Sequence, residues 1–78
     1  MASLLEKRLE RATTDEERGR INMELASHWA ESSLTSEGRG RAKDYYHNAM
    51  VRFKRAANTV DAAACIRLKA DIIMSEQR

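Results

Sequence analysis

The chain has 78 residues, enough for one domain with a thin hydrophobic core and too few for two. Its formal net charge is only +2, which gives no sign of a strongly polyanionic partner. It contains no apolar run of the roughly 20 residues that cross a bilayer, and no apolar stretch typical of a secretory signal. The single cysteine, Cys65, has no partner for an internal disulfide. We therefore expect a cytoplasmic protein without membrane contact.

The composition favours helices. Proline is absent, and Ala, Leu, Glu, Arg, Lys and Met, which are strong helix formers, dominate. Residues 1–78 are thus predicted to form one all-α domain, a compact bundle of three or four helices. A short first helix is expected from an N-cap at Ser3 to about Arg11.

The second helix has the clearest start signal in the chain. Thr13 with Glu16, and Thr14 with Glu17, both have capping-box spacing, and their acids suit the positive end of a helix. This helix should run from about residue 15 to residue 33. Its predicted buried stripe has members four residues apart: Ile21, Leu25 and Trp29. The alternative to burial in the core is that Trp29 contacts a partner protein, since tryptophan is enriched at the centre of protein interfaces.

Clustered Ser, Thr and Gly predict a break over residues 32–40, although Ser36 also fits as the cap of an earlier third helix. From residue 41 onward the apolar pattern stays in phase and includes Phe53 as a core residue. This pattern fits one long helix, or two helices separated at Asn58 with Asp61 in the next first turn. We favour two helices, a third and a fourth. We expect the second helix of the chain to pack against both of them.

The favoured fourth helix is expected to bury most of its apolar side chains. Those residues are Ile66, Leu68, Ala70, Ile72 and Ile73.

The spacing of Ala49, Phe53 and Ala56 resembles the second helix of a tetratricopeptide repeat. Ser36 and Glu37 depart from that motif's first helix, and amphipathic alanine-rich helices in general show the same spacing, so no family is assigned.

Residues for catalysis or metal binding do not form a recognisable pattern. His28, His47 and Cys65 lack the spacing of metal ligands, and Cys65 lies among apolar neighbours typical of a buried thiol. Glu16 and Glu17 are explained by their place in a first helical turn. We therefore predict a protein that is not an enzyme and that uses no metal or cofactor.

Charge is unevenly distributed along the chain. Residues 1–37 carry eight acids and five bases, whereas residues 38–78 carry four acids and nine bases. Several of these bases fall on or beside one expected face of the third helix, opposite its apolar stripe. We take them as candidate partner-binding residues: Arg39, Arg41, Lys43, Arg52, Lys54 and Arg55.

These features favour a protein-interaction module, such as a small regulator, an adaptor or a stoichiometric inhibitor, that acts through a helix face. In size and lack of a site it is similar to the short helical inhibitors of phages and other mobile elements. The alternative is a regulator that binds or mimics nucleic acid, using the basic residues. Because the core is small, we also expect self-association, with a helical dimer as the simplest form.

Overall fold

The computed structural model describes residues 2–32 and 35–76, and these form four helices and their connections. The helices are α1 (Ala2–Arg11), α2 (Asp15–Ser32), α3 (Ser36–Arg55) and α4 (Thr59–Glu76). The all-α prediction is confirmed. The Cα radius of gyration is 12.1 Å, close to the roughly 11.5 Å expected for a folded chain of this length. The expected end of the second helix at Ser33 lies outside the described residues.

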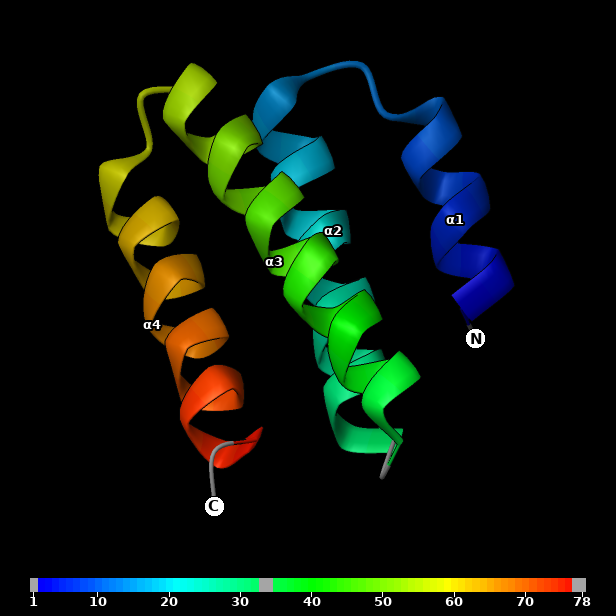
Figure 1. The fold of residues 1–78 in the computed structure, drawn as a ribbon. Helices are drawn as coiled ribbons and strands as arrows, with labels where there is room; N and C mark the ends of the chain where they lie inside the picture. Colours follow the sequence, from blue (N-terminus) through cyan, green and yellow to red (C-terminus); the bar gives the residue numbers. More distant parts are fainter. Residues whose placement is uncertain (1, 33–34, 77–78) are drawn as a thin grey trace.

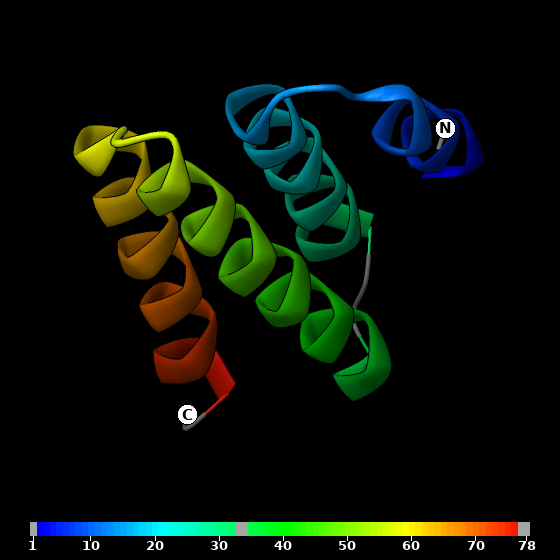
Figure 2. The same ribbon diagram turned by 90° about the horizontal axis from the view of Figure 1, so that it is seen from above.

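The helices are arranged in chain order as a curved, flattened layer (Figures 1 and 2). The principal extents are 38 × 27 × 12 Å. The antiparallel pair α2 and α3 lies in the middle, α1 packs on α2, and α4 packs on α3. The second helix was expected to pack on the fourth as well, but the extensive contacts of α4 are with α3 alone. As a result α4 lies at an edge of the layer.

Side-chain caps determine where α2 and α3 begin. The backbone N–H of Glu17 donates to Thr14 Oγ1 at 3.1 Å, so the second of the two predicted capping boxes is used. Thr35 caps α3 by accepting from the N–H of Gly38 at 3.2 Å. The predicted break over residues 32–40 is therefore wrong beyond Thr35, because this cap outweighs the low helix propensity of glycine. Ser3 was also placed wrongly as a cap, since α1 already begins at Ala2.

The chain turns between α3 and α4 without a glycine. The N–H of Asn58 donates to the carbonyl of Phe53 at 2.8 Å and that of Ala57 to Lys54 at 3.1 Å, the bonds of a Schellman motif. Ala57 takes the left-handed conformation, with φ of 58°. Asn58 then caps α4 by accepting from the N–H of Asp61 at 3.2 Å. The favoured reading of two helices is confirmed.

Two apolar clusters lie on either side of the central pair. One joins α3 to α4 through Ala49, Phe53, Ala62 and Cys65. The other joins α1 to α2 through Ala12, Ile21 and Leu25, with Leu5, Leu9 and Tyr45 packed against it. Phe53 is fully buried, as predicted, whereas Trp29, in the last turn of α2, is only half-buried. Trp29 is therefore not a member of either buried cluster.

Candidate interaction surfaces

The basic residues predicted to bind a partner are divided among different neighbours. Two of them point toward α4, where both approach the carboxylate of Glu76. The Nζ of Lys43 lies 2.7 Å from Glu76 Oε1, and the Nε of Arg39 lies 3.9 Å from Glu76 Oε2. These ion pairs join the beginning of α3 to the end of α4, so both cations already contact an acid within the fold.

Two further basic residues lie on the side of α3 that faces α2. Arg41 pairs with Glu37 at 3.2 Å, and its guanidinium carbon lies 4.8 Å from the centroid of the Trp29 ring, a cation–π contact. Arg52 Nη1 donates to Asp15 Oδ1 at 3.2 Å. The sequence placed these two arginines on one exposed face of the helix, but their partners on α2 were not foreseen.

The remaining two predicted residues, Lys54 and Arg55, are exposed in the last turn of α3. The six residues thus form three groups: one toward α4, one toward α2 and one at the end of α3. The role of all six in binding stays a prediction. Because internal ion pairs reduce the net positive potential of the surface, this arrangement gives less attraction to an anion than the sequence implied.

The residues considered as metal ligands lie apart. His28 is on α2, where its ring meets the edge of Trp29 with centroids 5.6 Å apart, and His47 is exposed on α3. Cys65 is fully buried on α4, and this burial raises the pKa of its thiol to about 11. Over residues 2–32 and 35–76, no three His, Cys, Asp or Glu side chains come close enough together to bind a metal ion.

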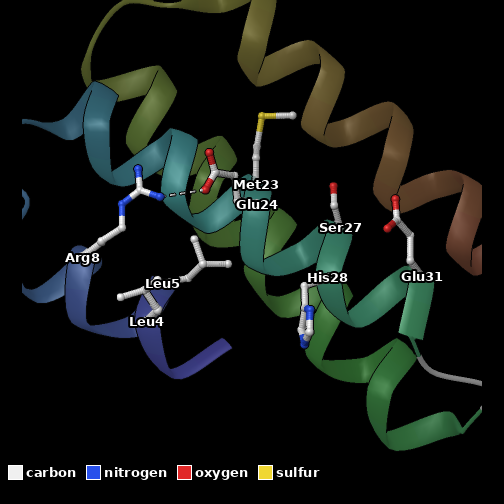
Figure 3. A pocket seen from close by; sticks show the side chains of 8 residues that line it. All are labelled: Leu4, Leu5, Arg8, Met23, Glu24, Ser27, His28 and Glu31. Atoms are coloured by element: carbon white, nitrogen blue, oxygen red, sulfur yellow. Dashed lines mark hydrogen bonds and ion pairs between the residues drawn. The ribbon is translucent and has the colours of Figure 1, made fainter. Parts of the chain in front are cut away.

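A groove of about 480 Å³ lies between α1 and α2 (Figure 3). Leu4, Leu5 and Met23 supply its apolar lining, and Leu4 is 58% exposed. Arg8 Nη1 donates to Glu24 Oε2 at 3.4 Å across the groove, in an exposed ion pair. A weak, solvated contact of this kind contributes little to holding the short α1 in place.

Among the described residues, the most extensive exposed apolar surface is on α4. Its large members are Val60 (78% exposed), Ile66 (52%), Ile73 (39%) and Met74 (63%). The exposed Ala63 and Ala70 lie between them, at helical spacings of three and four residues. We call these six residues the α4 apolar face. The buried residues of α4, Ala62 and Cys65, pack into the contact with α3.

The prediction that α4 buries Ile66, Ala70 and Ile73 is wrong. All three are exposed, and Leu68 and Ile72 are half-buried. The reason is the position of α4 at the edge of the layer: only its side toward α3 has a helix to pack against. A helix that is apolar around most of its circumference is normally covered on both sides. The sequence did show that apolar circumference, but we interpreted it as burial within the chain.

A second groove, of about 260 Å³, adjoins the α4 apolar face. It lies between α3 and α4, and its lining includes Tyr46 and Met50 from α3 with Ile66, Ala70 and Ile73 from α4. The groove and the face share three residues, so they form one continuous apolar surface. Such a surface suits a helix from another chain, which inserts side chains into a groove at intervals of three and four residues.

In the part of the chain that the structure describes, no helix is both long and apolar enough to cross a membrane. No protein-family model matches the chain, and neither the curated proteins nor the solved structures that were compared with it include a match.

Proposed function

We propose that this protein is a non-enzymatic interaction module and that its α4 apolar face binds another protein chain. One observation carries this proposal: among the described residues, four of the five large exposed apolar side chains belong to α4. Isolated exposed apolar residues are common on soluble proteins, but a contiguous patch on one helix marks an interaction site far more often. A small regulator, adaptor or stoichiometric inhibitor in the cytoplasm would work in this way.

The exposed area is large enough to contribute to binding but not to provide all of it. The exposed fractions of Val60, Ile66, Ile73 and Met74 together equal about two whole side chains. Their full burial would contribute roughly 3–6 kcal/mol. Association costs at least about 4 kcal/mol in lost translational and rotational freedom. Tight binding therefore requires the partner to enter the α3–α4 groove as well.

The ion pairs of the basic residues also favour a protein partner over nucleic acid. Arg39, Arg41, Lys43 and Arg52 each contact an acid of this chain. Binding a phosphate through any of them would require breaking or sharing that contact. Nucleic-acid binding stays the alternative, and it predicts affinity that falls steeply as salt is added.

The test is affinity capture with three tagged proteins in the cells that naturally produce this chain. One is the wild type, one carries Ile66→Glu and Ile73→Glu on the α4 apolar face, and the control carries Lys54→Gln and Arg55→Gln. All four substituted residues are solvent-exposed, so circular dichroism should show three folded helical proteins. We expect the wild type and the control to retain the same protein chain and the α4 variant to lose it.

Two results would count against the proposal. Capture that survives in the α4 variant and is lost in the control would move the site to the end of α3. Recovery of nucleic acid that the control no longer binds would support the alternative. Mass spectrometry identifies any captured chain, including untagged copies of this protein itself.

A further inference from the structure

We propose that the chain covering the α4 apolar face is a second copy of this protein, with the two α4 helices packed antiparallel about a two-fold axis. This inference rests on the proposed function, because it names the partner of the same surface. It is carried by the position of α4 in the layer, by the small residues on its exposed side and by the order of its charges.

The outer side of α4 is open along the whole helix. Its 18 residues span about 27 Å, and the neighbouring α3 lies on the opposite side (Figures 1 and 2). Ala63 and Ala70 are exposed members of the α4 apolar face, and Ala70 also lines the groove toward α3. Small side chains at a helix contact allow the two axes to approach closely, so larger neighbours such as Ile66 can pack beside the partner helix.

On this side of α4, a positive and a negative charge follow each other along the helix. The same two charges on an antiparallel copy run in the opposite order, so unlike charges can meet. Arg67 and Asp71 are both exposed and lie four residues apart on α4. In a two-fold interface, if residue i meets residue j of the second copy, then j meets i as well. An axis midway between these residues places Arg67 of each copy opposite Asp71 of the other, which forms the pair twice. A parallel arrangement in register would instead bring like charges together.

The antiparallel pair would also cover the groove beside the face. Two copies joined in this way bring α3 and α4 of one chain against α4 and α3 of the other, which is the composition of a four-helix bundle.

The experiment is sedimentation equilibrium of the purified full chain over about 1–500 µM, a range that detects dissociation constants in the micromolar region. We expect the mass to rise from 8.9 kDa toward twice that value as concentration increases. Arg67→Glu alone and Asp71→Arg alone should each weaken the dimer roughly tenfold, since each replaces two opposite-charge contacts with two like-charge contacts. The double variant Arg67→Glu/Asp71→Arg should restore it.

The controls separate the dimer from the general proposal. Lys7→Glu reverses an exposed charge on α1 and should leave the dimer unchanged. A wild-type mass of 8.9 kDa at every concentration would overturn the second copy as partner, and the proposed function would still stand if Ile66→Glu/Ile73→Glu loses a foreign chain in affinity capture. A dimer that the double charge reversal does not restore would overturn the antiparallel arrangement. A dimer unaffected by Ile66→Glu/Ile73→Glu would remove α4 from the interface.

Discussion

Replacing Gly19 by alanine should destabilise this protein, although alanine is the better helix former. A Cβ atom at Gly19 would lie 2.8, 2.9 and 3.0 Å from three carbons of the Phe53 ring. Phe53 is fully buried between α2, α3 and α4, so its ring has little room to move. The close approach of α2 to this ring is the physical reason for a glycine in the second turn of that helix.

The magnitude follows from two opposing effects. Alanine gains about 1 kcal/mol over glycine in helix propensity, whereas forcing an extra carbon into a packed core costs about 1–3 kcal/mol. We expect a net loss of about 1 kcal/mol, which lowers the melting temperature of a domain this small by roughly 4–8 °C. Gly40 provides the matched control, because a Cβ there would meet no atom within 4 Å. Gly40→Ala should therefore raise stability by up to about 1 kcal/mol.

Urea unfolding followed by circular dichroism at 222 nm measures both variants against the wild type. The signs should be opposite: a lower midpoint for Gly19→Ala and a higher midpoint for Gly40→Ala. If the two variants gain stability equally, the packing of Phe53 over α2 is not as described, and the reasoning fails. In a Phe53→Leu background, the penalty of Gly19→Ala should shrink, because the two residues are in contact.

Other substitutions test the core, the turn and the buried thiol. Phe53→Ala should lower the free energy of unfolding by about 3–5 kcal/mol and abolish the helical circular dichroism signal at 37 °C. Trp29→Ala should lower it clearly less, because Trp29 is only half-buried. Ala57→Gly should stabilise by about 1 kcal/mol in the same urea assay, because it removes the cost of a left-handed conformation. The pKa of Cys65 is raised from 9.0 to about 11 by burial, so between these pH values the unfolded thiol ionises while the folded one does not. Stability should therefore fall as the pH rises from 9 to 11, and it should fall less in Cys65→Ala; equal slopes would contradict the burial of this thiol.

Local signals in the sequence predicted helix boundaries where a side chain caps the backbone. Thr14 and Asn58 are examples, because a capping bond spans only three residues and needs no other part of the fold. The turn before Asn58 was harder to recognise, because alanine occupies the left-handed position that glycine usually takes. Gly38 misled in the opposite direction: it suggested a loop but lies within the first turns of α3.

Contacts between helices could not be read in the same way. The spacing of Arg41 and Arg52 on α3 was evident, but their contacts with Trp29 and Asp15 depend on how far α2 is shifted along α3. The exposure of Ile66 likewise depends on α4 lying at the edge of the layer. Periodicity shows which residues share a helix face, and only the tertiary arrangement decides whether that face is covered.

The central claim is that the α4 apolar face contacts another protein chain in the cell. Photo-crosslinking tests it most directly, with p-benzoylphenylalanine in place of Ile73 and, as the control, in place of the exposed Glu10 on α1. We expect irradiation of living cells to give a discrete cross-linked product from position 73 and none from position 10. Failure to form a product at position 73, or the same products from both positions, would contradict the claim.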